Sequence, residues 1–363
     1  MRVLLVNDRP PGGTSGAEVH LALLVDSLRE AGDEVETISS EPRRGAARAL
    51  DVWDPRAARR VAERVAAFSP TVVHHHNVLR ELSPAVLTAT RRVPSVLTVH
   101  DHRLFGVADA PTDGWLRQRA VARAAVLARR TARRHVTAVV AVDDATERRL
   151  EAYGFPQVTR LDLFAHDPGS PAAPASEKTD VVFAGRLAPD KGALELVHAF
   201  ASIAARHPRA VLALVGDGPQ RAAIEAVAAT LPGRIRVLGG VPHDEALSLM
   251  AGARVVAAPS FPSLRPETGP QTVLEAALRG RPVVTTEGVP LAALVRRSDG
   301  GAVVPPGHRG LLAAALERFL GDPTGARQAG ERARAVAVAH HTPEAVVPQL
   351  RALYARLAVG AAG

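Results

Sequence analysis

The sequence predicts an α/β protein of two doubly wound, Rossmann-like parallel-sheet domains that face a central cleft. Three observations predict this class. Short apolar runs alternate with helical patterns through the first half of the chain, a stretch without periodicity follows, and the alternation then starts again. Repeated strand–helix units form a parallel sheet covered by helices on both faces. Such sheets bind ligands at the carboxyl ends of their strands.

In the first half, apolar runs bounded by turn residues predict the strands, and a Gly-rich loop follows the first of them. The expected strands are 2–6, 34–38, 71–74, 95–99 and 137–142. Helical periodicity with plausible start and stop residues lies between them. The expected helices are 17–31, 55–68, 81–92, 115–134 and 144–153.

Residues 166–179 read HDPGSPAAPASEKT, and this Pro-, Ala- and Ser-rich stretch indicates a linker. Beyond it the expected strands are 181–183, 211–215, 235–238, 255–258, 282–285 and 302–304. Helical stretches close the chain, the last at about 344–357. We therefore expect an N-terminal domain at 1–165 and a C-terminal domain at 180–340. A terminal helix within 341–363 would pack back on the N-terminal domain.

Composition sets limits on location and chemistry. The chain has 363 residues, of which 47% are hydrophobic, enough to bury two cores. It has no cysteine, so disulfides and thiolate sites are excluded, which suits a reducing compartment. The N-terminus does not resemble a signal peptide, and no apolar run reaches the roughly 18 residues that a membrane span needs. We expect a cytoplasmic protein.

The net charge of +8 leaves anionic partners open. Aromatic residues make up only 3%, and no nucleic-acid-binding motif is present, so we expect no nucleic-acid partner. The basic stretch 115–142 contains many arginines and no acid. It favours either a solvated helix face or a peripheral contact with the anionic inner face of a membrane. Lys178 and Lys191 are the only lysines.

The most informative stretch is PSFPSLRPETGPQTVLEAALRGRPVV, residues 259–284. Pro270 favours a helix that begins at about Gln271 and Thr272, with Glu267 in the preceding loop and Glu275 inside the helix. The helix N-terminus suits a phosphate, and the two carboxylates can accept hydrogen bonds from sugar or ribose hydroxyls. Ordinary solvated glutamates would show the same spacing.

A second loop, GRLAPDKG at 185–192, follows an apolar strand. Arg186 and Lys191 bracket a tight turn there. Together they can neutralise a diphosphate leaving group, on which negative charge develops during transfer. The alternative is a solvated loop that carries two of many cations.

Glycine loops and histidines follow other strands. PPGGTSGAE contains Gly16, and GDGP begins at Gly216; such loops let backbone approach a ligand. His74 and His76 should face one side of their strand and His75 the other, which makes a poor metal site. His100 follows the next strand. No D-x-D sequence occurs, so we expect no metal-bridged diphosphate.

Taken together, these motifs resemble glycosyltransferase family 4, whose members have the GT-B fold. The resemblance covers nearly the whole chain. It rests on SGAEVH, TVVHHHN, PSVLTVHDHR, GRLAPDKG, LVGDGP, GVPHDEALSLMAGARVVAAPS and the block at 259–284. The resemblance departs after Arg103, at residues 161–164, and at 287–291, where relatives often read Gly-Gly-x-x-Glu.

The resemblance implies a retaining, metal-independent transferase without a bound cofactor. Its donor would be a UDP-, GDP- or dTDP-sugar, bound by the C-terminal domain, and the N-terminal domain would bind the hydroxyl acceptor. Glu275 would bind the ribose and Glu267 the transferred sugar. Arg186 and Lys191 would bind the diphosphate, with amides near Gln271 and Thr272.

By the same resemblance, Gly16 and Gly216 would lie against the donor, and His100 beside the reacting centre. We expect His76 and His100 to contact the acceptor, either a small natural product such as an aminocyclitol or a lipid-linked saccharide. Two alternatives share this architecture. One is a nucleotide-sugar epimerase or a phosphorylase, and the other is a non-catalytic partner that binds nucleotide sugar.

Overall fold

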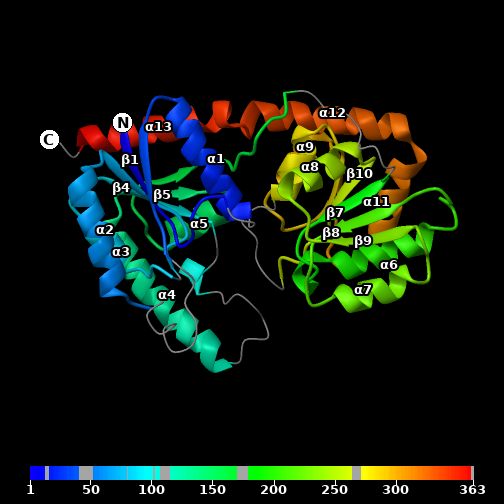
Figure 1. The fold of residues 1–363 in the computed structure, drawn as a ribbon, viewed down its shortest axis with the longest axis horizontal. Coiled ribbons are helices and arrows are strands. Elements are labelled where there is room, and N and C mark those ends of the chain that lie inside the picture. The colour runs from blue at the N-terminus through cyan, green and yellow to red at the C-terminus, as the bar shows by residue number, and fades with distance from the viewer. Residues whose placement is uncertain are drawn as a thin grey trace. The chain divides into compact units, whose positions relative to one another are not determined.

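The computed structural model describes residues 1–12, 16–40, 52–79, 81–100, 103–106, 115–169, 179–263 and 271–360. The chain divides into two compact units, whose elements are labelled in Figure 1. Unit 1 comprises Met1–Leu163 with Pro343–Gly363, and unit 2 comprises Phe164–Thr342. The final helix thus belongs to the unit that the beginning of the chain forms.

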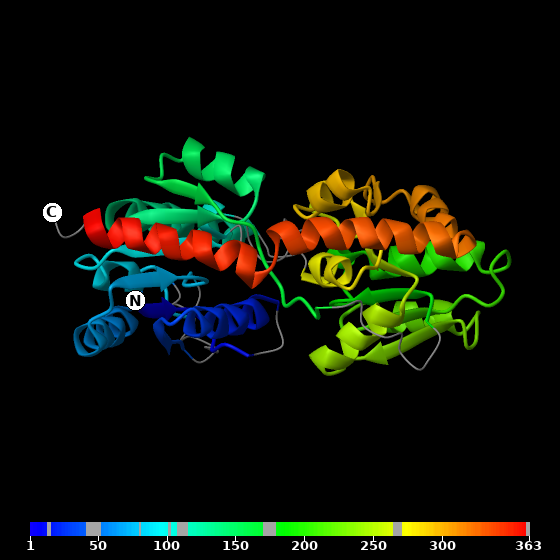
Figure 2. The ribbon, with the colours of Figure 1, turned by 90° about the horizontal axis from the view of Figure 1, so that it is seen from above.

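Unit 1 is built on a parallel sheet in the order β2-β1-β3-β4-β5-β6. Its strands are β1 (Arg2–Val6), β2 (Glu34–Ile38), β3 (Val72–His75), β4 (Ser95–Val99), β5 (Ala138–Ala141) and β6 (Val158–Arg160). Its helices are α1 (Gly16–Glu30), α2 (Pro55–Phe68), α3 (Val86–Ala89), η2 (Arg103–Phe105), α4 (Trp115–His135), α5 (Asp144–Ala152) and α13 (Pro343–Gly360). Helices α1 and α13 pack together on one face, and α2, α3 and α4 pack in succession on the other (Figures 1 and 2).

Unit 2 repeats the design with the strand order β12-β11-β10-β7-β8-β9, all parallel. Its strands are β7 (Val181–Ala184), β8 (Leu212–Val215), β9 (Ile235–Gly239), β10 (Val255–Ala258), β11 (Val283–Thr286) and β12 (Gly301–Val304). Its helices are η3 (Pro189–Lys191), α6 (Ala193–Ile203), α7 (Arg221–Ala228), α8 (His243–Gly252), α9 (Gln271–Leu278), α10 (Ala292–Ser298), α11 (Arg309–Gly321) and α12 (Pro323–His340). Helices α6, α7 and α11 cover one face, and α8, α9, α10 and α12 cover the other.

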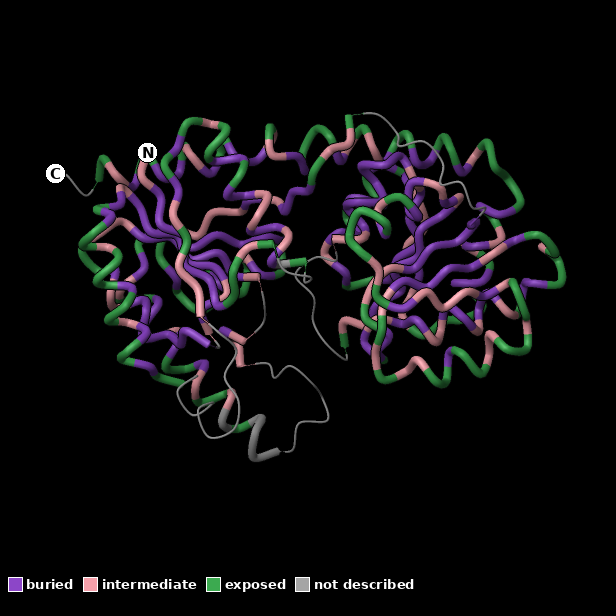
Figure 3. The backbone as a smooth tube through the Cα atoms, in the orientation of Figure 1, coloured by how far each residue is buried: buried purple, intermediate pink, exposed green. Residues whose placement is uncertain are grey.

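The central strands of each sheet are buried on both faces, as Figure 3 shows for each unit. All residues of β3, β4, β8, β10 and β11 are buried, which explains why their sequences are apolar runs rather than alternating patterns. In each sheet the winding direction reverses once, between β1 and β3 in unit 1 and between β7 and β10 in unit 2. Ligands bind beside such switch points, at the carboxyl ends of the strands.

The predicted doubly wound fold is confirmed, and the predicted strands shift by at most one residue at either end. One strand was not predicted, and one expected helix was wrong in its bounds. Strand β6 was missed because three residues at a sheet edge leave no pattern. The helix expected at 81–92 shrinks to α3, because Ser83 adopts a left-handed φ of 64° and Leu82 N donates to the Asp8 carboxylate at 2.8 Å.

Candidate active site

The loop after β7 presents Arg186 at the switch point of unit 2. Its Nη2 donates to both carboxylate oxygens of Asp190, at 2.9 and 2.7 Å. Asp190 is buried, whereas the Arg186 side chain is 45% exposed. The Asp190 carbonyl in turn accepts from Phe261 N at 2.8 Å. Asp190 therefore fixes the position of the Arg186 guanidinium, which remains partly exposed to solvent. Lys191 is the last residue of η3.

Close backbone packing requires a glycine at position 216, directly after β8. Gly216 has a φ of 130°, and a Cβ there would lie 1.9 Å from the carbonyl oxygen of Gly185. Leu187 N also donates to the Asp217 carbonyl at 2.9 Å. The two loops thus pack backbone against backbone, which no larger residue at 216 would allow.

Helix α9 begins at Gln271, as the sequence predicts, and its first turn is attached to β7. Thr272 Oγ1 donates to the carbonyl oxygen of Ala184 at 3.0 Å. This bond holds the N-terminus of α9 beside the loop that carries Arg186. Among the described residues, the buried Oε1 of Gln271 has no hydrogen-bond partner. Glu267 lies outside the described residues.

Glu275 lies one turn after Gln271, on the same side of α9. The residue is 7% exposed, and Oε1 lies 3.4 Å from Nε2 of His243, the first residue of α8. Burial raises the pKa of the Glu275 carboxyl, and the nearby His243 and Arg279 oppose that rise. Unit 2 thus gathers Arg186, Gly216 and the start of α9 around one switch point, with Glu275 buried beside them.

Unit 1 contains a histidine cluster at the carboxyl ends of β3 and β4. Nδ1 of His76 and Nε2 of His100 share a hydrogen bond of 2.9 Å, and the rings stack at 5.2 Å. The His74 ring lies 4.2 Å from His76 on the same face of β3. His75 points the other way, toward Thr90 at 3.1 Å, as strand alternation predicts.

Burial keeps this cluster neutral. It lowers the pKa of His100 to about 3 and that of His76 well below its usual value, with further lowering by neighbouring histidines. Each neutral imidazole can donate one hydrogen bond and accept another, but it carries no charge. Gly16, the other site residue predicted in this unit, is exposed at the first position of α1.

Sequence reasoning missed three partners of these residues. Asp190 holds Arg186, His243 contacts Glu275, and His20 of α1 lies edge-on to His100 with ring centroids 5.5 Å apart. His20 follows Gly16 by one helical turn, so the SGAEVH motif could have indicated that both lie on one face.

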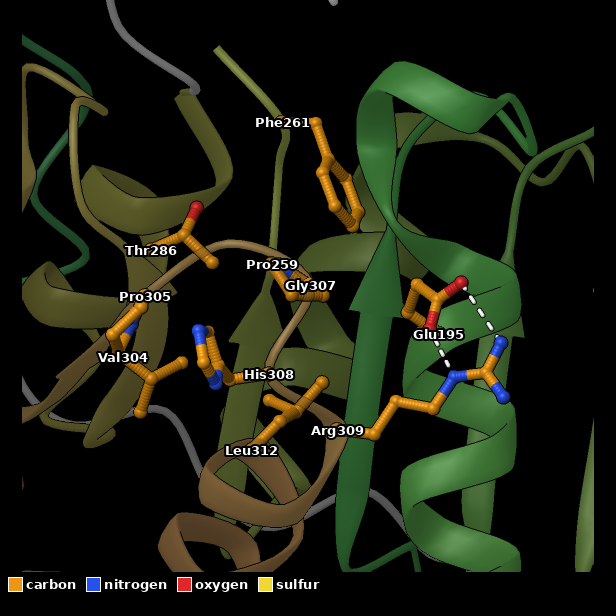
Figure 4. A pocket seen from close by; sticks show the side chains of 10 residues that line it. All are labelled: Glu195, Pro259, Phe261, Thr286, Val304, Pro305, Gly307, His308, Arg309 and Leu312. Atoms are coloured by element: carbon orange, nitrogen blue, oxygen red, sulfur yellow. Dashed lines mark hydrogen bonds and ion pairs between the residues drawn. The ribbon is translucent and has the colours of Figure 1, made fainter. Parts of the chain in front are cut away.

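A small pocket lies at the carboxyl ends of β10, β11 and β12 in unit 2 (Figure 4). Phe261 forms one wall, His308 points into it, and the ion pair of Arg309 with Glu195 stands at its edge. Thr286 Oγ1 donates to the Ser260 carbonyl beside it. These contacts hold the segment after β10 that leads toward residue 264.

Two doubly wound sheets with cationic and carboxylate side chains at a switch point define the class of GT-B nucleotide-sugar enzymes. Comparisons agree. Residues 14–161 match Glycosyltransferase Family 4, and residues 178–322 match Glycosyl transferases group 1. The chain is 31% identical to 2-deoxystreptamine N-acetyl-D-glucosaminyltransferase of Streptomyces fradiae, over 70% of this chain and 68% of that protein.

It is also 26% identical to alpha-D-kanosaminyltransferase of Streptomyces kanamyceticus, over 75% of this chain and 72% of that protein. Solved structures share the fold. Sucrose-phosphate synthase of Thermosynechococcus elongatus gives a TM-score of 0.79 at 22% identity, over 99% of both chains. The Anabaena protein HepE in complex with UDP-glucose gives 0.74 at 20% identity, over 98% of this chain and 100% of that chain.

The chain belongs to glycosyltransferase family 4. It is a hexosyltransferase of the GT-B class that uses nucleotide sugars.

Proposed function

We propose that this enzyme transfers a hexose, with retention of configuration, from a nucleoside-diphosphate sugar to a hydroxyl of an aminocyclitol-type natural product. The donor part of this proposal is supported by three features at the switch point of unit 2: Arg186, Lys191 and the N-terminus of α9. The acceptor half is supported by curated relatives that are named as 2-deoxystreptamine glycosyltransferases.

The proposed donor site works mainly by electrostatics. Arg186, oriented by Asp190, and Lys191 contact the diphosphate, and amides of Gln271 and Thr272 at the start of α9 add further donors. These contacts strengthen as the sugar leaves, because negative charge then builds on the departing phosphate. Groups already in place need no reorganisation during the reaction.

We assign Glu275 to the donor ribose and Glu267 to the transferred hexose. Glu275 is held rigidly on a buried helix, which suits a contact that does not change during transfer. Gly16 and Gly216 are assigned to backbone approach toward the donor. No metal or cofactor is required in this scheme.

His100 and His76 are assigned to the acceptor. A neutral His100, positioned by its bond to His76, contacts the reacting centre without repelling a cationic acceptor. The acceptor hydroxyl attacks C1 on the face that the diphosphate leaves. The bond from C1 to the diphosphate oxygen breaks, the new glycosidic bond forms, and the hydroxyl proton passes to the departing phosphate.

The test is a mass-spectrometric screen of UDP-, GDP- and dTDP-sugars with 2-deoxystreptamine as acceptor, with and without excess EDTA. We expect a glycosylated product from one donor class, undiminished by EDTA. Lys191→Ala should lower kcat at least about 100-fold, as for other groups that stabilise developing charge. The control is Arg327→Ala, which removes an exposed cation of α12 and should leave the rate unchanged.

Other outcomes separate the alternatives. Turnover of donor without acceptor would indicate an epimerase, dependence on inorganic phosphate a phosphorylase, and binding without any turnover a non-catalytic partner. A Lys191→Ala enzyme as fast as the wild type would overturn the diphosphate assignment.

A second candidate acceptor, a lipid-linked saccharide, is favoured by one surface of α4. Its exposed face presents Arg119, Arg123 and Arg130 together with two exposed aliphatic residues, Val126 (40%) and Leu127 (38%). Cations that flank exposed aliphatic side chains are typical of a helix that lies on an anionic membrane.

A further inference from the structure

We propose that His76 is a positioning residue that fixes the tautomer of His100, so that the basic nitrogen of His100 is occupied before a substrate binds. The consequence for catalysis rests on the proposed function, in which His100 contacts the reacting centre. It concerns the proton of the acceptor hydroxyl, because a ring whose basic nitrogen is already engaged cannot take that proton.

The two rings lie at the carboxyl ends of neighbouring strands. His76 directly follows β3, His100 directly follows β4, and these strands pair in parallel. Nδ1 of His76 lies 2.9 Å from Nε2 of His100. A hydrogen bond between two neutral imidazoles needs an N–H on one ring and a bare nitrogen on the other. Two arrangements therefore remain, which differ in the ring that donates.

Both rings are neutral. Burial lowers the pKa of His100 to about 3, and it lowers the pKa of His76 well below its usual value. Each ring thus carries a single proton, and its second nitrogen is bare. If His76 donates from Nδ1, its Nε2 is bare. If His76 instead accepts at Nδ1, its Nε2 carries an N–H.

The surroundings of His76 Nε2 decide between the two arrangements. His76 is 4% exposed, and its Nε2 is buried without a hydrogen-bond partner in the described part of the chain. A buried N–H without an acceptor is rare in proteins, whereas a buried acceptor with an unused lone pair is less so. The bare form of Nε2 is therefore favoured. The proton of His76 then lies on Nδ1, which donates to Nε2 of His100.

His75 shows the same preference on the opposite face of β3. Its ring is neutral, because burial lowers its pKa to about 3. Thr90 Oγ1 donates its only proton to the Leu87 carbonyl at 3.2 Å, so the 3.1 Å bond between Thr90 and His75 is donated by His75 Nε2. Nδ1 of His75 is therefore bare, and this buried nitrogen has no partner among the described residues. His75 thus also leaves its bare nitrogen, and not an N–H, unpaired.

The tautomer of His100 follows from that of His76. Because Nε2 of His100 accepts, the single proton of this neutral ring lies on Nδ1. Neither nitrogen can take a second proton unless the bond to His76 breaks, so His100 is not the base of the reaction. The proton of the acceptor hydroxyl passes instead to an oxygen of the departing phosphate, as the bond from C1 to that phosphate breaks and the glycosidic bond forms.

NMR of the protein with 15N-labelled histidine tests the tautomers directly, because a protonated ring nitrogen and a bare one differ strongly in chemical shift. We expect the protons of His76 and His100 to lie on Nδ1 in the wild type. Loss of signals in His76→Asn and in His100→Asn assigns the two rings. The matched control is His340→Asn, at an exposed residue of α12, which should leave both rings unchanged. A wild-type His100 protonated on Nε2 would overturn the proposal.

Two variants of His76 test whether this residue sets the tautomer. An ionised aspartate can only accept hydrogen bonds, whereas an asparagine can still donate. The proton of His100 should therefore move to Nε2 in His76→Asp and stay on Nδ1 in His76→Asn. If a folded His76→Asp protein keeps that proton on Nδ1, His76 only fills space and the proposal fails. The wild-type and His76→Asn spectra remain decisive if His76→Asp does not fold.

Steady-state kinetics of His100→Asn test the consequence for catalysis. Asparagine keeps an amide N–H near the place of Nδ1 but has no basic nitrogen. Loss of a general base typically lowers the rate by about 100- to 10,000-fold, so we expect kcat to fall by less than about 100-fold. A fall of about 100-fold or more would show that His100 is the base. His340→Asn should retain the wild-type kcat.

The two kinds of measurement separate this inference from the proposed function. The ring nitrogen shifts do not depend on turnover. A wild type that transfers no sugar but is protonated on Nδ1 of His100 would contradict the proposed function and leave the tautomer assignment standing. A wild type that transfers sugar with the proton on Nε2 of His100 would do the reverse.

Discussion

The buried carboxylate of Glu275 lowers the folding stability of the protein, although it is the group that we assign to ligand binding. The residue lies inside α9 among core positions such as Val273 and Leu278, which are completely buried. Burial penalises the charged form of its carboxyl and raises its pKa, although His243 lies 3.4 Å away. A charged group kept at such a place costs folding stability above its usual pKa. A ligand hydroxyl that donates to the carboxylate would offset that cost.

We therefore expect Glu275→Gln to stabilise the free protein while it weakens donor binding. The folded-state pKa is raised, so the wild-type carboxyl destabilises the fold increasingly as pH rises above its usual value of 4.5. The melting temperature of Glu275→Gln should exceed that of the wild type by a margin that grows from pH 4 to pH 7. The donor KM should rise by about 10- to 150-fold with little change in kcat.

Melting curves and steady-state kinetics check the two halves. The control is Glu63→Gln, at an exposed carboxylate of α2. A Glu275→Gln protein that is less stable at pH 7, or that loses kcat with its KM intact, would contradict the role given to this residue.

At the scale of elements, helix α13 completes unit 1 from the far end of the chain. It packs against α1 and β3. Tyr354 of α13 is completely buried, and its hydroxyl shares a hydrogen bond with Nδ1 of His74, whose Nε2 bonds Thr98 at 2.7 Å. Arg351 adds an ion pair with the buried Asp33 at 2.8 Å. The helix thus packs against β3, the strand that directly precedes His76.

Tyr354→Phe should destabilise unit 1 without abolishing the fold. The substitution keeps the ring and removes the partner of a buried imidazole nitrogen, which typically costs about 1–3 kcal/mol. Urea denaturation should show this loss. Tyr153→Phe, at a residue that is 40% exposed, is the control and should change stability by less than about 0.5 kcal/mol. Equal stability of the two variants would mean that the Tyr354 hydroxyl contributes nothing to the docking of α13.

Sequence patterns predicted the strands and helices better than they predicted contacts between residues far apart in the chain. Apolar runs marked the strands because parallel strands are buried on both faces, and Pro270 marked the start of α9. Interactions between distant segments left no local pattern, so neither the bond of Tyr354 to His74 nor the bond of Leu82 N to the Asp8 carboxylate could be predicted. Those contacts depend on the sheet order, which sequence periodicity does not give.

At the scale of the whole molecule, charge is unevenly distributed. The chain carries a net charge of +8. Arginines are abundant on α4, where Arg123, Arg130 and Arg134 are exposed. None of the helices formed by described residues has an apolar stretch long enough to cross a bilayer. We propose the exposed face of α4 as the surface that would contact an anionic membrane.

Vesicle sedimentation tests whether α4 makes that contact. If it does, the protein should co-sediment with vesicles that contain anionic phospholipid and not with neutral vesicles, because each arginine near the surface contributes about 1 kcal/mol. Salt should release it, since the Debye length falls to about 3 Å at 1 M. A double variant, Val126→Asp with Leu127→Asp, should abolish binding at all salt concentrations, because it removes the inserted aliphatic pair and opposes the anionic surface.

The matched control is Val338→Asp, at an apolar residue of α12 that is 38% exposed, and it should bind vesicles as the wild type does. Binding of the double variant at wild-type strength would place the membrane contact elsewhere. Absence of wild-type binding at low ionic strength would leave α4 as a solvated helix. The balance would then shift toward the soluble, amine-bearing acceptor.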